Sequence, residues 1–449
     1  MSSFFAQVLD ILIVLLGDPF SAKTWQVIFQ FIPFVLFFEV PVYLLVTLGI
    51  LKYGLIRMSE KYTQDRNFPS VSCIITCYSE GEGVKRTIQT LAEQFYPGLI
   101  QIIAVIDGAA QNQKTYEAAK SMENVVSRIP KRSLLVLPKW KRGGRVSSLN
   151  AGLAVARGDI VMALDGDTSF DNNMVERATR HFEDPDVACV AGSLKVRNIR
   201  KSLVTRLQAI EYFFSIQASK TGLSAFNMVN NISGAFGVFR KDVLKAVMGW
   251  STGSAEDLDL TLRVKNYFGR YKNMKIVFDP EAVGLTDVPE TFRDFFRQRL
   301  RWDGDLSYIY FRKHWMSFNP RLVGWKNFIA LLWTGLLFQI VMPFAITGYL
   351  TYLAVAFPVS FALGIMALVY LFYLSVTAFF FIIFVLVLSE RPWQDMKLFP
   401  WIVFMPLFSM INRVHNAFST LWEIFGKAHQ DTSMAPWWVI KRREKTDET

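Results

Sequence analysis

Residues 327–389 constrain the fold most strongly, because none of these consecutive positions carries a charged side chain. A stretch of this length can hold two membrane helices of about 20 to 25 residues each, with a turn that we place near Pro358. Residues 24–51 form a second apolar stretch, in which Glu39 is the one charged residue, and they are long enough to span once. The shorter segment 4–16 fits either an interfacial helix or a short first span, and we favour the span.

The net charge of +11 comes from 49 basic and 38 acidic residues. The basic residues concentrate in 52–326 and in the run 441–445, which the positive-inside tendency places on the cytoplasmic side. Nucleic-acid binding is the usual alternative, but beside membrane segments this charge fits anionic lipid headgroups and an anionic substrate better. Cys73, Cys77 and Cys189 lack metal-like spacing and are typical of reduced cytosolic thiols. We therefore expect a cytoplasmic soluble part and no nucleic-acid partner.

The stretch between the membrane segments alternates strand runs with helical stretches. The strand runs are 71–76, 102–106, 133–137 and 160–164, and helical stretches occupy 84–94 and 113–125. This alternation predicts a doubly wound, mainly parallel α/β sheet, and the absence of GxGxxG argues against a dinucleotide cofactor. Ligands collect at the carboxyl edge of such sheets. The acids expected at that edge are Glu80, Asp107, Asp165 and Asp167.

Asp165 and Asp167 flank Gly166 directly after the fourth strand. Two carboxylates this close are costly to bury unpaired, and a divalent cation that holds a diphosphate would neutralise them. The alternative for an isolated pair is a solvated Asp-Gly turn. The basic loop 139–145 precedes the pair, and its Gly-Gly turn followed by a helix is typical of an anion cradle. A solvated loop is the other interpretation, but the acidic pair downstream favours a phosphate-facing role for the loop and its Arg145.

Three acids stand in the first turn of a further predicted helix: Glu256, Asp257 and Asp259. The helix dipole favours acids there, and N-terminal capping would account for one of them. One of the others is therefore a candidate general base.

The stretch 289–302 carries an aromatic stripe and an arginine stripe at helical spacing. Such a helix fits the membrane surface just before the uncharged block. In that position it would press three side chains against the soluble domain: Gln298, Arg301 and Trp302.

The C-terminal third begins with a predicted cytoplasmic turn, followed by the apolar stretch 398–425, which Arg413 interrupts. A full span there would put the basic tail outside, so we predict a re-entrant or interfacial helix. The tail fits a disordered end whose tryptophans, Trp437 and Trp438, anchor at the membrane interface. The predicted segments are membrane segments in 1–60, a soluble α/β domain at 68–288, an interfacial helix at 289–320, two membrane helices at 321–388, the turn and re-entrant or interfacial helix at 389–426, and the tail at 427–449.

Over residues 70–310 the chain resembles the membrane-embedded processive family 2 glycosyltransferases, which include cellulose, chitin, hyaluronan and poly-N-acetylglucosamine synthases. The marks that carry the resemblance occur in the family's order: Asp107, the DxD Asp165-Gly166-Asp167, Glu256-Asp257, and the QxxRW motif Gln298-Arg299-Leu300-Arg301-Trp302. Pro289-Glu290-Thr291 and the chain length are most similar to the poly-N-acetylglucosamine synthases. Two positions depart from that pattern, the acidic Asp303-Gly304-Asp305 and Ala255 where threonine is usual.

The resemblance implies a GT-A fold and an inverting transfer from a UDP-sugar, most similar to UDP-N-acetylglucosamine, to a growing polysaccharide. It also implies Mg²⁺ or Mn²⁺, a location in the cell membrane with a cytoplasmic catalytic domain, and accessory export proteins as partners. For the tail it implies a gating loop that closes over the donor, with Trp437, Trp438 and Lys441 as its candidate residues. The implied roles are uracil and ribose binding by Tyr78, Glu80 and Asp107, nucleotide contact by Asp165 with Arg145, metal coordination by Asp167, proton abstraction by Asp257 beside Glu256, diphosphate binding by Gln298 and Arg301, and acceptor stacking on Trp302.

Two other functions fit part of the sequence. A non-processive transferase that adds one sugar to a lipid carrier would share Asp107 and the DxD, but the QxxRW and the flanking membrane segments argue against it. A transporter or scaffold without catalysis would leave the acidic strand and helix ends unexplained. If a polymer is exported, Glu39 is a candidate for a polar channel, because ionisable groups in apolar spans usually face a cavity or the bundle interior. The alternative is a Glu39 that is buried and protonated, or one that pairs with a neighbouring helix.

Overall fold

The computed structural model describes residues 38–59, 67–251 and 255–426. Its centre is an eight-stranded sheet in the order β3-β2-β1-β4-β7-β6-β8-β5. The strands are β1 (Val71–Cys77), β2 (Ile100–Asp107), β3 (Arg132–Lys139), β4 (Ile160–Asp165), β5 (Ser169–Phe170), β6 (Val187–Val196), β7 (Phe236–Arg240) and β8 (Lys275–Thr286). The first four strands in this order run parallel, whereas β7 is antiparallel to both β4 and β6. The predicted mainly parallel sheet is confirmed.

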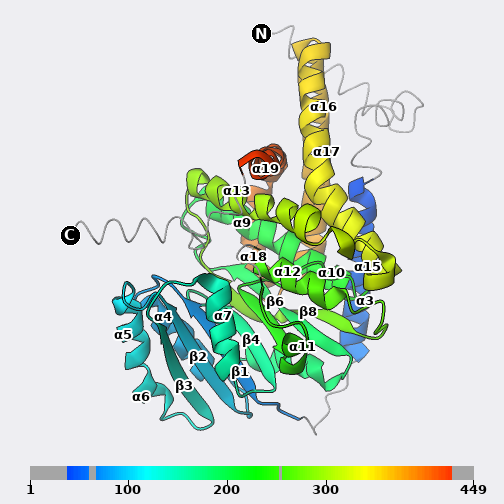
Figure 1. Ribbon diagram of the computed structural model, residues 1–449. Helices are drawn as coiled ribbons and strands as arrows, with labels where there is room; N and C mark the ends of the chain where they lie inside the picture. The colour runs from blue at the N-terminus through cyan, green and yellow to red at the C-terminus, as the bar shows by residue number, and fades with distance from the viewer. Residues whose placement is uncertain (1–37, 60–66, 252–254, 427–449) are drawn as a thin grey trace, which may run out of the picture.

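Helices cover both faces of this sheet (Figure 1). One core contains side chains from α4 (Gly83–Ala92), α5 (Gln113–Ser121) and α8 (Met174–Arg180). The opposite core contains side chains from α7 (Gly144–Val155), α11 (Lys241–Ala246) and α12 (Glu256–Lys265). The central strands are buried on both faces, which explains why they read as continuous apolar runs rather than alternating ones. The helical stretch expected at 113–125 divides at Met122 into α5 and the short α6 (Glu123–Val126).

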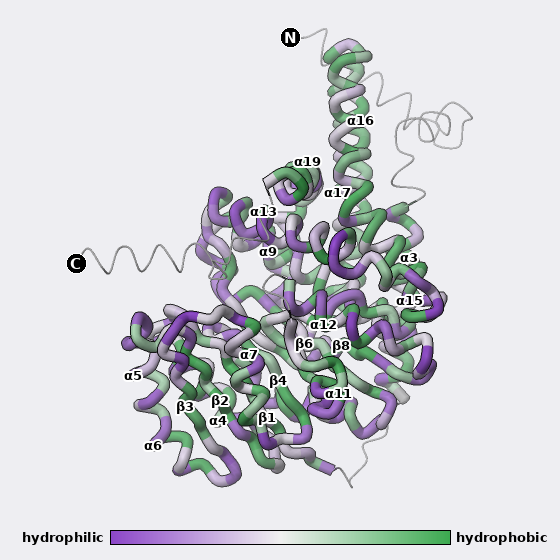
Figure 2. The backbone as a smooth tube through the Cα atoms, viewed as in Figure 1, coloured by the Kyte–Doolittle hydropathy of each residue, from purple (hydrophilic) through white to green (hydrophobic). Residues whose placement is uncertain are grey.

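Three described helices are long and apolar enough to cross a membrane: Val40–Met58, Trp325–Ala356 and Val359–Leu388. The last two meet at Phe357 and Pro358, where a turn was predicted. Their elements are α15 (Trp325–Ala330), η6 (Leu331–Val341) and α16 (Met342–Ala356), followed by α17 (Val359–Leu388). α16 and α17 project away from the sheet, and hydrophobic residues dominate the projecting part (Figure 2).

The N-terminal described helix α3 (Val40–Ser59) continues past Leu51, the end of the predicted span. Residues 1–37, including the segment 4–16, lie outside the described residues. α3 packs on α10 (Ser219–Ser224), where Gly49 meets the backbone of Gly222 with no room for a Cβ. Lys52 Nζ donates to the Ala225 carbonyl at 2.8 Å, which also fastens α3 to the sheet domain.

Two further helices lie together between the sheet domain and the projecting helices (Figure 1). α13 (Phe292–Tyr308) begins at an N-cap in which Thr291 Oγ1 accepts from Asp294 N at 3.2 Å, and it carries the QxxRW motif. α19 (Met405–Gly426) packs along α13, with Gly304 facing Glu423 and Ser419. Among the described residues α19 is not one of the candidate spans, and its interfacial or re-entrant placement stays a prediction. The remaining elements here are α9 (Leu203–Tyr212), η3 (Phe213–Ala218), η4 (Ile309–Lys313), η5 (Trp315–Ser317), α14 (Pro320–Val323), α18 (Pro392–Asp395) and η7 (Met396–Phe404).

Candidate active site

The DxD turn lies at the carboxyl edge of β1 and β4, where Thr76 is paired with Asp165. Two bonds fix the turn: Gly166 N donates to the Thr76 carbonyl at 3.2 Å, and Thr87 Oγ1 of α4 donates to the Gly166 carbonyl at 2.8 Å. A Cβ on Gly166 would lie 3.2 Å from the carboxyl carbon of Glu80, so Glu80 packs directly against the turn. Folding therefore brings Glu80 and the two aspartates together, as the strand order predicted.

Burial raises the pKa of two of these carboxyl groups, Asp167 and Glu80. Burial, and then the charge of Asp165, raise the pKa of Asp167 to about 6. Burial raises the pKa of Glu80 to about 8, and its Oε2 has no hydrogen-bond partner among the described residues. No cluster of three metal-ligating side chains occurs in the described part of the chain. The residues present fit a cation held jointly with a diphosphate, because Mg²⁺ usually takes one or two carboxylates plus phosphate oxygens.

Asp107 holds the basic loop in place. Asp107 is 5% exposed, and its carboxylate accepts from Lys139 Nζ at 2.7 Å, Gly143 N at 2.8 Å and Gly144 N at 2.9 Å. Both oxygens are thus engaged by the loop, and contact with a ribose stays a prediction. In the same loop the Arg142 guanidinium lies 4.2 Å from the centroid of the Tyr78 ring. Arg142 was not singled out from the sequence, although the basic run that contains it was.

Arg145 connects the two acidic groups of the site. Its guanidinium pairs with Asp165 and, at 2.5 Å, with Glu256 Oε1. It also donates to Thr76 Oγ1 at 2.8 Å and to the Gly234 carbonyl at 2.6 Å. Arg145, which was predicted to face a phosphate, therefore links the DxD to the start of α12. Any contact of Arg145 with a phosphate would be made while it is paired with these acids.

Glu256 and Asp257 open α12 and face the glycine-containing segment 231–237. Asp257 Oδ2 accepts from Gly234 N at 2.9 Å and from Asn231 Nδ2 at 3.2 Å. Glu256 is buried, and burial raises its pKa while the Arg145 guanidinium partly offsets that effect. A Cβ on Gly234 would lie 3.1 Å from Glu256 Oε1, so glycine permits this close approach.

The QxxRW motif lies on α13. Burial lowers the pKa of its Arg301, whereas the carboxylates of Asp305, Glu256 and Asp165 act to raise it. Trp302 is 38% exposed, with the Arg299 guanidinium 5.0 Å from its ring centroid.

The predicted residue Gln298 and the unpredicted residue Lys220 are both removed in part from solvent. Gln298 Oε1 is buried and lacks a hydrogen-bond partner among the described residues. Lys220 of α10 is half-buried, and burial lowers its pKa to about 8 while Asp257 acts in the other direction. Nothing in the sequence pattern singled out Lys220. Trp437, Trp438 and Lys441 lie outside the described residues.

Glu39 is paired with an arginine of another helix. It is 3% exposed, and its Oε1 lies 3.2 Å from Arg413 Nη2 of α19. Arg413 also donates to the Phe338 carbonyl at 3.0 Å and lies 5.0 Å from that ring centroid. This is the pairing with a neighbouring helix that was the alternative to a channel-facing Glu39.

Comparison with known proteins decides the family. Residues 69–304 match the family model described as "Glycosyltransferase like family 2". The chain belongs to glycosyltransferase family 2. Poly-beta-1,6-N-acetyl-D-glucosamine synthase of Staphylococcus epidermidis is 26% identical to this family 2 glycosyltransferase over 310 residues, which cover 67% of this chain and 71% of that protein. An N-acetylglucosaminyltransferase of Rhizobium meliloti is 25% identical over 60% of this chain and 61% of its own.

The fold has a solved counterpart. The mannosyltransferase PcManGT from Pyrobaculum calidifontis, determined in complex with GDP-Man and Mn²⁺, superposes with a TM-score of 0.51 at 16% identity. The superposition covers 86% of this chain and 98% of that one. The sheet domain of this family 2 glycosyltransferase is therefore of the GT-A type, as expected. The candidate spans together with the synthase relatives indicate a membrane protein.

Proposed function

We propose that this enzyme is an inverting, metal-dependent and processive glycosyltransferase that builds a β-linked polymer from UDP-N-acetylglucosamine. The observation that carries the proposal is the Arg145 link, because this guanidinium pairs with Asp165 of the DxD and with Glu256 beside Asp257 and so holds the two acidic groups together. The staphylococcal and rhizobial relatives support N-acetylglucosamine as the donor sugar. The basic character of residues 52–326 supports a catalytic domain on the cytoplasmic face of the cell membrane.

In the proposed reaction Asp257 takes the proton of the acceptor hydroxyl as that oxygen bonds to C1 of the sugar. The bond between C1 and the diphosphate oxygen breaks on the opposite face, and UDP leaves with the electron pair. An α-linked donor thereby gives a β-linked product. Arg301 would stabilise the negative charge that develops on the diphosphate. Asp167, with Asp165 beside it, would hold Mg²⁺ or Mn²⁺, which supplies further charge neutralisation at the diphosphate.

Export of the polymer is the second part of the proposal. A hydroxyl-rich chain cannot cross hydrocarbon unaided, so it would leave through the helices that follow the site. Trp302 is half-exposed on α13, directly before the candidate spans, and would stack under the acceptor sugar. A transferase that adds a single sugar to a lipid carrier is the alternative, and the length of the product separates the two.

Purified enzyme in vesicles, with the catalytic domain outside, should convert UDP-N-acetylglucosamine into a polymer that is protected from added glycosidase. Trp302→Ala should shorten or abolish that polymer, because the acceptor loses its stacking surface, whereas Trp325→Ala, which removes an exposed tryptophan of α15, should leave its length unchanged. Product size and glycosidase protection are the measurements. A single added sugar in the wild type would establish the lipid-carrier alternative, and polymer that stays digestible would exclude export.

Glu39→Leu is expected to impair elongation without weakening UDP binding, if Glu39 contributes to the polymer path. The Arg413 pair complicates this variant, because removal of one partner from a buried pair typically destabilises by about 3–5 kcal/mol. The double variant Glu39→Leu/Arg413→Leu removes the unpaired charge and should recover stability while elongation stays impaired. Thermal unfolding and polymer length are measured for both variants. Normal elongation by the double variant would show that Glu39 serves only as the partner of Arg413.

A further inference from the structure

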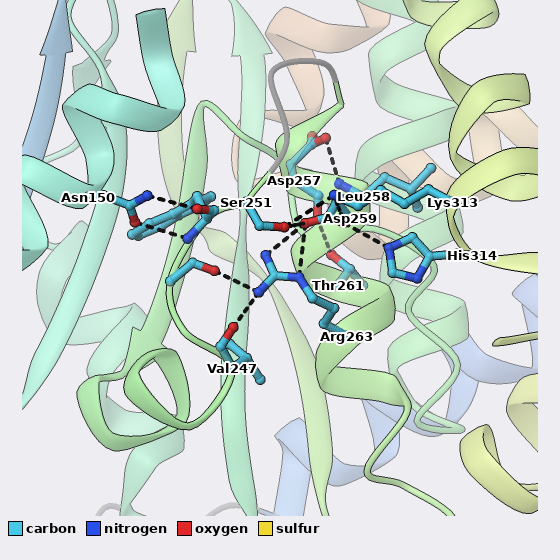
Figure 3. Close-up of polar contacts among 12 residues, drawn as sticks. Asn150, Val247, Ser251, Asp257, Leu258, Asp259, Thr261, Arg263, Lys313 and His314 are labelled. Carbon is cyan, nitrogen blue, oxygen red and sulfur yellow. Dashed lines mark hydrogen bonds and ion pairs between the residues drawn. The ribbon is translucent and has the colours of Figure 1, made fainter. Parts of the chain in front are cut away.

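Asp259, the third acid of α12, is fully buried and surrounded by donors (Figure 3). Its Oδ1 lies 2.8 Å from His314 Nε2 and 2.7 Å from Lys313 Nζ. Its Oδ2 accepts from Arg263 Nε and Nη2 at 2.9 and 2.7 Å and from Ser251 Oγ at 3.0 Å. Capping alone does not require such a set of partners, so Asp259 serves as more than a helix-start residue.

These partners come from two separate parts of the chain. Lys313 is the last residue of η4, which continues α13 without a break, and His314 follows it. Arg263 extends the network to the turn after α11, where Nη1 donates to the carbonyls of Val247 and, at 2.8 Å, Gly249. One carboxylate thus ties α12 to the far end of the QxxRW helix and to the turn that precedes α12.

Several contacts hold the first turn of α12. Its N-cap residue Ala255 has a left-handed backbone (φ 45°) and makes no side-chain cap hydrogen bond. The Glu256 and Asp257 carboxylates are held toward the donor side, through Arg145, Gly234 and Asn231. On the other side, Leu258 belongs to an apolar cluster with Leu306 of α13 and Ile309 of η4. The bonds of Asp259 add directional polar contacts between this turn and the residues at the end of η4.

The carboxylate of Asp259 is ionised at neutral pH. Burial acts to raise its pKa, but the hydrogen bonds from His314 and Lys313 and the Arg263 guanidinium hold the pKa well below its usual range. Since Asp259 Oδ1 can only accept, His314 carries a proton on Nε2, and its Nδ1 lies 3.3 Å from Ser317 Oγ. Loss of the carboxylate would leave the partly buried Arg263 and Lys313 without this counter-charge.

We propose that Asp259 is a positioning residue, which keeps the base Asp257 at a fixed place relative to Arg301 and Trp302 on α13. This inference rests on the proposed function, because it assigns Asp259 a part in the same transfer reaction. The donor-side residues of β1, β2 and the basic loop make none of the contacts described for Asp259. A displaced base should therefore slow the chemical step and leave donor binding intact, since a shift of about 1 Å can reduce a rate about 100-fold.

Two substitutions at His314 separate this role from simple packing. His314→Phe keeps the ring volume but removes the donor to Asp259, and we expect kcat to fall at least about tenfold, with UDP affinity within about twofold of the wild type. His314→Gln retains a nitrogen donor near the position of Nε2 and should recover most of that loss. Asp259→Asn should lower kcat further than His314→Phe does. It provides a second test of the inference if His314→Phe folds poorly.

The chain offers a matched control. Asp279 of β8 is also fully buried, its Oδ2 lies 2.8 Å from His181 Nε2, and Arg180 lies nearby at 3.3 Å. His181→Phe breaks the same kind of pair away from the site. It should therefore lower thermal stability about as much as His314→Phe does, and leave kcat unchanged.

The outcomes are distinct. The inference is overturned if His314→Phe keeps the wild-type kcat, if His314→Gln is as slow as His314→Phe, or if His181→Phe slows transfer equally. A loss of UDP affinity that matches the loss of kcat would also overturn it, since a general structural defect would explain both. If the wild type transfers no sugar from any UDP-sugar, the proposed function itself fails and the inference fails with it.

Discussion

Replacement of Asp257 by asparagine is expected to abolish glycosyl transfer while UDP binding stays nearly intact. A positioned general base typically contributes about 100- to 10,000-fold to the rate, and the amide cannot accept the acceptor's proton. The substitution keeps the size of the side chain and one acceptor oxygen, which can still bond to either Gly234 N or Leu258 N. The measurements are UDP release at saturating UDP-sugar and the affinity for UDP by titration.

The Asp257 variant has an internal comparison. Glu256→Gln should weaken the link to Arg145 and therefore alter donor affinity as well as rate, whereas Asp257→Asn should alter the rate alone. A variant at position 257 that keeps more than about a tenth of the wild-type rate, which is a loss under about 1.4 kcal/mol, would remove Asp257 from the role of base.

Asp167→Ala is expected to lower UDP affinity at least about tenfold, or about 1.4 kcal/mol, and to make the remaining affinity insensitive to a chelator. In the wild type the chelator should itself weaken UDP binding, because the carboxylate and the diphosphate would hold the cation together. Affinity is titrated with Mg²⁺, with Mn²⁺ and with chelator.

Asp159→Ala is the control for the metal experiment. Asp159 lies at the opposite end of β4, where its Oδ2 accepts from Ser70 Oγ at 2.7 Å, away from the carboxyl edge. This variant should keep both the affinity and its dependence on the cation. If Asp167→Ala binds UDP as tightly as the wild type, with and without chelator, Asp167 has no part in metal binding.

The sequence by itself determined the elements that local patterns encode. Buried strands read as apolar runs, so β1, β2, β3 and β4 were found within a few residues of their bounds, and their parallel order placed Glu80 beside the DxD. The uncharged block likewise located the two apolar helices that meet at Pro358, because charged side chains are costly in hydrocarbon and spans therefore read as long apolar runs. The aromatic and arginine stripes of residues 289–302 located α13.

Only the tertiary structure decided which charges neutralise one another. Arg145 was expected to face a phosphate, yet it joins Asp165 to Glu256, a residue 111 positions away in the chain. Glu39 was a channel candidate, and it pairs with Arg413, 374 positions away. Asp259 looked like one of several helix-start acids until Lys313 and His314 were placed against it. Periodicity reports which face of an element is buried, but the partner of a buried charge depends on how distant elements pack, and that information is absent from any local stretch of sequence.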